Sequence, residues 1–432
     1  MSAGIIVMNK NAIAMAADSA VTVGDHAAIH NSANKLFALS MFEPIGAIIY
    51  ANAQFMQIPM EIIIKQYKIE LGKRNFHTLQ EYVDDFVAFL ERNSDLFHFK
   101  NNEETYVIGI CIDLLQGLAN GYTNRAKKLI EKKGRPLTEA EDKEIKKISI
   151  EETIQYIDSQ PKVRDDFSDY VESNYLGKIV AFIENQIKWV DDKNDLAKRI
   201  CKLFDTHFTR KGYMGMAIAG YGKSEIFPHM VHLKLSGILN GKLRFETIST
   251  MDIDELQTAA IIPLAQMDVM HTFMRGYNDL ILEQVANSIP QLINQRLDKV
   301  PNTVLDDEEK KRSKESFVGF QNDVVKLIQA ISNDVFVRPI IESVTSLPID
   351  ELALFAESMI NITSVRRRVA IDGNIGTVGG PIDVAIVTRG DGLIWLKRKH
   401  YFEAKKNPQY MFSRYGQPIH EPIRGVINSD DE

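Results

Sequence analysis

The chain has 432 residues, of which 45% are hydrophobic and 25% are charged, the composition of an ordinary globular protein. Its formal net charge of −7 argues against a general affinity for nucleic acid or for an anionic membrane surface. No apolar run is as long as a membrane span, and the N-terminus does not resemble a signal peptide, so we expect a soluble cytoplasmic protein.

The cysteine content supports the same expectation. Cys111 and Cys201 are the two cysteines, and they form neither a CxxC pair nor a metal-like cluster. We expect both to be buried and reduced, as in a reducing compartment.

The first fifty residues are rich in strand-like segments. The apolar runs "AGIIVM" and "AIAMAAD" are separated by the polar "NKN", which predicts a hairpin with strands over 3–8 and 12–17. Further extended segments are expected within 26–40 and over 45–53.

Two helices are predicted next. The first covers 55–72 and ends at Gly72, which serves as its C-cap. The second covers 77–93, where Thr78 and Glu81 have the spacing of a capping box and apolar residues recur at helical intervals.

The remainder alternates between helical and strand-like stretches. Residues 95–205 are charged and helical, with Glu–Lys neighbours typical of a solvated helix face. Strands are predicted at 213–222, 229–239 and 242–250, several amphipathic helices follow, and a hairpin with "RGDG" at its turn closes the fold before a polar tail. Sheets at both ends of the chain must pair, which predicts an α+β fold with layers in the order αββα.

Ser2, Asp18 and Lys35 form the candidate catalytic set. A serine hydroxyl needs a base, and the α-amine of Ser2, freed by removal of Met1, has an ordinary pKa of about 7.7–8.0. A lysine cation nearby favours the neutral amine, and an aspartate would hold that lysine in place. The predicted hairpin places Asp18 beside Ser2, and Lys35 lies on the next apolar segment.

Each residue also has a structural interpretation. Ser2 is a common small residue after an initiator methionine, Asp18 in "AADS" suits a turn, and Lys35 suits a strand edge that must not pair further. The glycines of "GNIGTVGG" (373–380) are compatible with a nucleotide-binding loop, but a turn into the last strand explains them better.

The stretch "AMAADSAVTVG…NKLFAL" resembles the N-terminal region of proteasome β-subunits and HslV-type peptidases. These are N-terminal-nucleophile (Ntn) hydrolases with a four-layer αββα sandwich. "IAGYGKSEIFPHMVHL", "LPIDELALFAESMI" and "TVGGPIDVAIVTRGDG" are similar to later segments of that family, in the right order. The resemblance implies an Ntn core with helical insertions, divided as follows: core 1–94, 206–275 and 346–402; insertions 95–205 and 276–345; polar tail 403–432.

The resemblance also implies supporting residues, and the chain departs from the family pattern at several of them. Serine replaces the family's threonine nucleophile. The glycine whose N–H forms the oxyanion hole corresponds to Ala51, and a backbone donor is all that this role requires. The late serine corresponds to Val378 or Thr377, with Asp372 as the nearby acid, and the middle serine is replaced within "LAQMD".

Two functions follow as hypotheses. The first is an Ntn amidohydrolase or peptidase that uses Ser2, Asp18 and Lys35, acts on peptide or amide substrates without metal or organic cofactor, and forms homo-oligomers. The second is a catalytically silent scaffold of the same fold, in which the helical insertions assemble oligomers or bind a partner.

Overall fold

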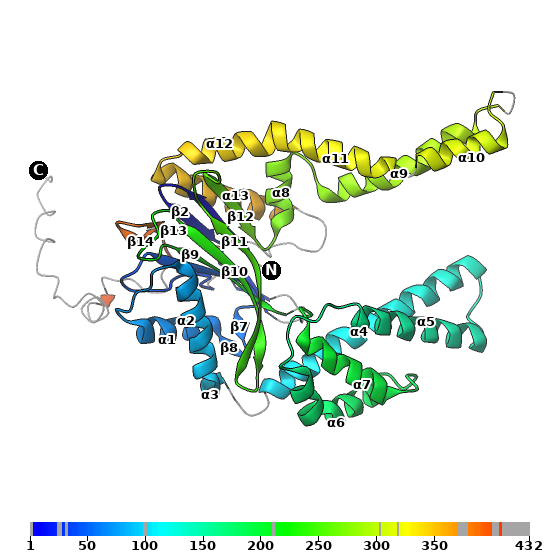
Figure 1. Cartoon of the computed structure of the whole chain (residues 1–432), viewed down its shortest axis with the longest axis horizontal. Helices are drawn as coiled ribbons and strands as arrows, with labels where there is room; N and C mark the ends of the chain where they lie inside the picture. The colour runs from blue at the N-terminus through cyan, green and yellow to red at the C-terminus, as the bar shows by residue number, and fades with distance from the viewer. Residues whose placement is uncertain are drawn as a thin grey trace, which may run out of the picture.

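The computed structural model describes residues 3–23, 28–30, 33–97, 102–209, 212–301, 304–317, 319–369, 379–399 and 406–407. Within these residues two five-stranded sheets form the centre of the molecule, and helices surround them (Figure 1). This mixed architecture agrees with the predicted α+β class.

The first sheet joins the two ends of the described chain. Its order is β12-β1-β2-β13-β14, and all neighbouring strands are antiparallel. The predicted N-terminal hairpin is confirmed, with Gly4 opposite Ala17. Its turn is held by Asn9, whose side-chain oxygen accepts the N–H groups of Asn11 and Ala12. The strands are β1 (Gly4–Asn9), β2 (Ile13–Ala17), β12 (Ala259–Leu264), β13 (Asp383–Thr388) and β14 (Gly392–Lys397).

The second sheet is also antiparallel, with the order β11-β10-β9-β6-β5. The strands predicted near 213–222, 229–239 and 242–250 are present in it. Its members are β5 (Leu36–Ala38), β6 (Ile45–Ala51), β9 (Met214–Gly220), β10 (His229–Leu239) and β11 (Lys242–Asp252). Two short hairpins accompany the sheets: β3 (Val21–Val23) with β4 (Ala28–His30), and β7 (Gln54–Phe55) with β8 (Ile58–Pro59).

The sheets pack against each other through a layer of buried side chains. Two glycines permit the close approach. A Cβ at Gly46 would lie 2.5 Å from Met15 Sδ, and a Cβ at Gly4 would lie 3.1 Å from Ile48 Cγ2. Other members of this layer are Ile6, Met8, Ile13, Ala217, Ala219 and Leu264.

Helices cover the other face of each sheet. Helices α1 (Met60–Leu71) and α2 (Leu79–Arg92) pack on the second sheet through a large apolar cluster. Helices α8 (Met267–Arg275), α12 (Arg338–Ser346) and α13 (Ile349–Val369) pack on the first. The burial of these helix faces supplies most of the stability that holds the layers together.

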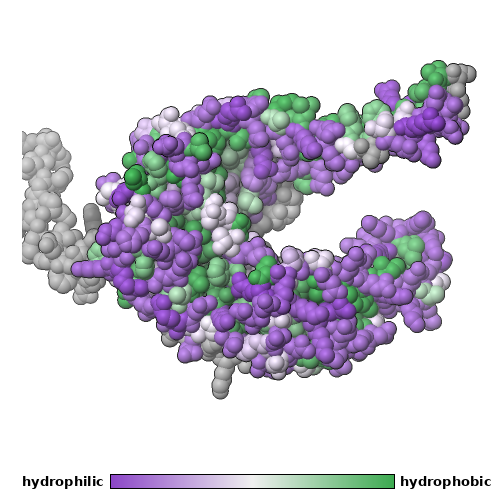
Figure 2. Space-filling model, in the orientation of Figure 1, coloured by the Kyte–Doolittle hydropathy of each residue, from purple (hydrophilic) through white to green (hydrophobic). Residues whose placement is uncertain are grey.

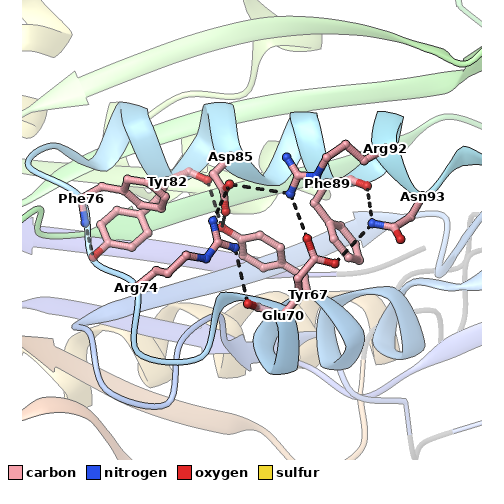
Figure 3. Close-up of polar contacts among 9 residues, drawn as sticks. All are labelled: Tyr67, Glu70, Arg74, Phe76, Tyr82, Asp85, Phe89, Arg92 and Asn93. Carbon is pink, nitrogen blue, oxygen red and sulfur yellow. Dashed lines mark hydrogen bonds and ion pairs between the residues drawn. The ribbon is translucent and has the colours of Figure 1, made fainter.

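Polar contacts join α1 to α2 at the surface (Figure 3). The Tyr67 hydroxyl donates to Asp85 at 3.1 Å, Arg74 pairs with Asp85 at 3.0 Å, and Arg92 pairs with Glu70 at 2.9 Å. Because the two arginine side chains are close to half exposed, their ion pairs add little to stability. The buried aromatic rings beneath them contribute more.

Two boundary predictions need correction. The helix predicted from residue 55 begins at Met60, because Gln54–Pro59 forms the β7–β8 hairpin. The predicted capping box is half formed: Thr78 Oγ1 accepts the Glu81 N–H at 3.3 Å, but the Glu81 carboxylate accepts the N–H of His77 instead of that of Thr78.

The helices of residues 95–205 form an arm with its own apolar core (Figure 1). Buried Arg244 of β11 fastens this arm to the second sheet by donating to the carbonyl oxygens of Leu203, Phe204 and Thr206. Cys111 and Cys201 are buried and free, as predicted. After the short α3 (Ser94–Phe97), the arm comprises α4 (Asn102–Lys133), α5 (Glu139–Asp158), α6 (Ser168–Gln186), α7 (Lys193–Lys202) and a 3-10 turn (Leu203–Asp205).

A second arm extends from the core toward the same side as the first, above it in the view of Figure 1. It is built from α9 (Asp279–Asp298), α10 (Asp307–Ser316), α11 (Phe320–Ser332) and a π-helical turn (Asn333–Val337). Among the described side chains of these three α-helices, only Leu282 and Ser332 are buried. No helix within the described residues is long and apolar enough to span a membrane. The division of the chain into core and insertions stays a prediction.

Candidate functional site

Asp18 and Lys35 lie in contact inside the protein. Asp18 follows β2 and Lys35 precedes β5, so each continues a segment fixed by sheet pairing. Lys35 Nζ lies 2.5 Å from Asp18 Oδ1, and the two side chains are 3% and 0% exposed. Burying two charges is costly, and only close pairing with further hydrogen bonds offsets that cost.

Asp18 receives those further hydrogen bonds from three backbone N–H groups. Oδ1 accepts from Ala3 at 2.8 Å, while Oδ2 accepts from Ala20 at 3.2 Å and from Gly379 at 3.1 Å. The Asp18 N–H donates in turn to the Ala3 carbonyl at 3.1 Å. One carboxylate therefore joins the start of β1, the end of β2 and the segment before β13.

Lys35 is held equally closely. Its ammonium also donates to the Ala20 carbonyl at 2.6 Å. Burial lowers the pKa of Lys35, attraction to Asp18 opposes that change, and the nearby Lys399 lowers the pKa further. Because Lys35 Nζ and the Ala3 nitrogen bind the same oxygen, the two nitrogens lie within about 5 Å of each other.

A second ion pair, partly buried, lies beside the first. Asp383 opens β13 and lies opposite Ala17, the residue before Asp18. Its carboxylate accepts the Lys399 N–H at 2.9 Å and also pairs with the Lys399 ammonium. This pair was not predicted from the sequence, although one acidic residue within the apolar "PIDVAIV" was a signal for it.

Ala51 ends β6 in a conformation that alanine rarely adopts. Its φ is +64°, in the left-handed region, where a Cβ costs about 1–2 kcal/mol. The residue is exposed and lies opposite Met214 of β9. The resemblance assigned a glycine of the family to this position, and glycine is the residue that tolerates this φ most easily.

Tyr50, the neighbour of Ala51, makes a contact that the sequence analysis missed. Its hydroxyl lies 2.5 Å from Nε2 of His232 on β10, and both side chains are buried. Burial raises the pKa of Tyr50 and lowers the pKa of His232 to about 4, so both groups are neutral near pH 7. A neutral imidazole with an unprotonated Nε2 can accept a hydrogen bond from the Tyr50 hydroxyl.

Ser2, Asp372, Thr377 and Val378 lie outside the described residues. Ser2 directly precedes Ala3, the first described residue, whose N–H is bound by Asp18. Gly379 directly follows the stretch that contains the other three, and its N–H is also bound by Asp18.

Cofactor binding finds no support among the described residues. In that part of the chain no group of three or more His, Cys, Asp or Glu side chains could hold a metal ion. Most of the "GNIGTVGG" loop lies outside the described residues, and Gly379 within it bonds to Asp18 and Ser19.

No family model matches this chain, and no curated protein matches it either. Among solved structures it is similar to Anbu, the ancestral beta-subunit, from Yersinia bercovieri, at 9% identity and a TM-score of 0.27, over 96% of this chain and 92% of that one. An Anbu mutant from Hyphomicrobium sp. strain MC1 gives 9% identity and a TM-score of 0.27 over 100% of both chains. The helical assembly of the Anbu complex from Pseudomonas aeruginosa gives 8% and 0.26, over 96% and 94%. Shared function does not follow from TM-scores of this size.

Proposed function

We propose that this chain is an Ntn hydrolase with a four-layer αββα core, in which Ser2 cleaves amide bonds after Met1 is removed. The observation that carries the proposal is the buried Asp18–Lys35 pair, bound through Asp18 to the N–H of Ala3. A buried lysine next to the Ser2 amine can keep that amine unprotonated through its positive charge, a role that a solvent-exposed lysine at a strand edge would lack. The core and insertion boundaries given above belong to the same proposal.

The reaction requires one nucleophile and one base, and Ser2 supplies both. Ser2 Oγ attacks the carbonyl carbon of the substrate, and its proton passes to the Ser2 α-amine, directly or through a water molecule. The C–N bond then breaks, and the proton moves from the α-amine to the departing nitrogen. Water attacks the resulting ester by the same route, releases the acid and restores the serine.

Lys35, Asp18 and Ala51 support this chemistry in different ways. The positive charge of Lys35 disfavours protonation of the neighbouring amine and so keeps more of it in the basic form. Asp18 holds Lys35 and the Ala3 N–H in fixed positions. The Ala51 N–H serves as the donor to the oxyanion of the tetrahedral intermediate.

The substrate class is a peptide or another amide, and no step requires a metal or organic cofactor. Asp372 and Thr377 are the candidates for orienting the amine. We further propose a cytoplasmic location, which the two buried free cysteines support, and a homo-oligomeric state, which the family resemblance implies.

Hydrolysis of an unfolded protein substrate tests the proposal. The appearance of new α-amines measures cleavage by the wild-type protein, by Ser2→Ala and by Ser2→Thr. We expect the Ser2→Ala protein to be inactive, whereas Ser2→Thr retains activity because it keeps a hydroxyl beside the amine. Equal rates for wild type and Ser2→Ala would show that another residue, or a contaminating peptidase, performs the cleavage.

The second arm favours one alternative, a non-enzymatic scaffold. Its helices bury almost nothing within the described structure, while Leu280, Leu292, Leu327 and Ile331 are 52–69% exposed. Hydrophobic residues are visible along this arm and at its end (Figure 2). Such a surface suits contact with another protein. An acetylated Ser2 amine together with loss of self-association in Leu327→Glu would favour the scaffold over the hydrolase.

A further inference from the structure

The side chain of Tyr50 crosses a neighbouring strand to reach its partner. Tyr50 lies opposite Gly215 of β9, whereas His232 is on β10, one strand further across the sheet. A Cβ at Gly215 would lie 2.1 Å from Cζ of Tyr50, so the ring occupies the space that a side chain at position 215 would fill. The glycine is therefore what allows the Tyr50 hydroxyl to meet His232.

This hydrogen bond lies in the mostly apolar layer between the two sheets. Tyr50 belongs to the inter-sheet cluster with Ile48 and Leu264. A phenylalanine would bury its ring at this position without the cost of placing a hydroxyl in apolar surroundings. A satisfied polar pair in such a layer fixes one arrangement of the side chains, and here it fixes the end of β6.

The end of β6 is where the strained Ala51 lies. On one side, Tyr50 is held by His232; on the other, Asn52 Nδ2 donates to the Gly212 carbonyl at 3.2 Å and Asn52 Oδ1 accepts the Gln54 N–H at 3.0 Å. A non-glycine residue keeps a left-handed conformation only when its surroundings determine it. The Ala51 peptide is thus held by side chains on both flanks.

We infer that Tyr50 is a positioning residue, which through its hydrogen bond to His232 holds the Ala51 N–H where the oxyanion forms. This inference rests on the proposed function, since it assigns a task within the same site. It predicts that the bond affects the rate of acyl transfer and leaves initial substrate binding nearly unchanged.

The structure offers a matched control in Tyr67. Its hydroxyl is also buried and hydrogen-bonded, to Asp85, but it lies between α1 and α2 on the far side of the second sheet from the inter-sheet layer (Figure 3). Replacing either tyrosine with phenylalanine removes one buried hydroxyl and leaves the ring in place. Any difference in rate between the two variants therefore reports on position and not on the loss of a buried bond.

A β-lactone supplies the measurement. Ser2 Oγ attacks the lactone carbonyl, the ring C–O bond breaks, the Oγ proton ends on the released hydroxyl, and the protein gains the full mass of the lactone. Intact mass against time, over a range of lactone concentrations, separates the maximal acylation rate from the half-saturating concentration. Periodate cleavage of the N-terminal serine, which passes through no oxyanion, measures access to Ser2 independently.

For Tyr50→Phe we expect a maximal acylation rate about tenfold lower, with a half-saturating concentration and a periodate rate within about twofold of wild type. Tyr67→Phe should acylate at the wild-type rate. His232→Phe should match Tyr50→Phe, and the double variant should lose no more than either single variant, because all three lack the same bond. The His232→Phe variant tests the inference even if the Tyr50→Phe protein does not fold.

Two results would overturn it, and they can be told apart. If the lactone acylates the wild type, and Tyr50→Phe or His232→Phe reaches the same maximal acylation rate, the inference is wrong and the proposed function stands. A wild-type protein that periodate cleaves but the lactone does not acylate removes the proposed function, and the inference with it.

Discussion

Asp18 Oδ1 binds the Lys35 ammonium at 2.5 Å, at a position where neither side chain is more than 3% exposed. The same oxygen accepts the Ala3 N–H, so the pair is joined to the start of the first strand. Removing the charge of one partner leaves the other as an unpaired charge buried away from water.

Replacing Lys35 with methionine should therefore lower the free energy of unfolding by about 3–5 kcal/mol. Adding Asp18→Asn should restore part of that loss, since it removes the isolated charge. Urea unfolding measures both. Lys65→Met is the control: its side chain is 67% exposed in an ion pair with Glu61, and its removal should change stability by less than about 0.5 kcal/mol. A Lys35→Met protein as stable as wild type would contradict this account of the pair.

Gly215→Ala should displace the Tyr50 ring, because the new Cβ would meet it at 2.1 Å. We expect a loss of about 1–3 kcal/mol in unfolding free energy. Gly117 of α4 provides the opposite case, since nothing lies within 4 Å of a Cβ built there. Gly117→Ala should stabilise the protein by about 1 kcal/mol through helix propensity. If both alanine variants unfolded at the same urea concentration, the packing of Tyr50 over Gly215 would be wrong.

His232 should make stability depend on pH in a defined direction. Burial lowers its pKa in the folded state from 6.5 to about 4, so between these values the unfolded chain binds the proton more readily. Stability should therefore fall as the pH is lowered from 6.5 to about 4, and this contribution should level off below that. Tyr50 is the titratable group that contacts the imidazole, and its ordinary pKa of about 10 lies well outside this interval.

Comparison with His232→Gln isolates the effect of that one imidazole. The difference in unfolding free energy between the wild type and the variant should shrink by about 2–3 kcal/mol from pH 7 to pH 4.5, since glutamine takes up no proton. A difference independent of pH would show that His232 titrates normally or not at all in this range.

Arg244→Met should loosen the first helical arm more than the sheets. Arg244 is 2% exposed, and its replacement removes a charged donor from the carbonyls of Leu203, Phe204 and Thr206. Hydrogen exchange should accelerate in α7 and the turn that follows it, while β1 and β2 keep their protection. Lys242→Met, which removes a largely exposed cation from the same strand, should leave exchange in α7 unchanged. Uniform acceleration across the whole chain would argue against a local anchor.

Local sequence patterns predicted the elements whose signal is contained within a few residues. The N-terminal hairpin follows from two apolar runs around a polar turn, and the end of α1 follows from Gly72, whose φ is +53°. The start of that helix was predicted too early, because apolar residues at Phe55 and Ile58 fit the pattern of a helix as well as that of a short hairpin. Only the pairing of Gln54–Phe55 with Ile58–Pro59 separates the two.

The candidate site was predictable where chemistry and spacing coincided. Asp18 and Lys35 stood out because a serine, a lysine and an aspartate near a hairpin form a coherent set. Tyr50 and His232 did not, since they are 182 residues apart and become neighbours only across three strands of the second sheet. Asp383 and Lys399 were missed for a related reason: a surface charge and a buried one look alike in sequence until the strand register is known.

The central claim is that Ser2 carries both a free amine and the reactive hydroxyl. Mass spectrometry of the N-terminal peptide, from purified protein with and without β-lactone treatment, tests it most directly. We predict a peptide that begins at Ser2 with an unmodified amine and, after treatment, carries one lactone on the Ser2 side chain. A peptide that retains Met1, an acetylated Ser2, or an adduct on any other residue would contradict the claim.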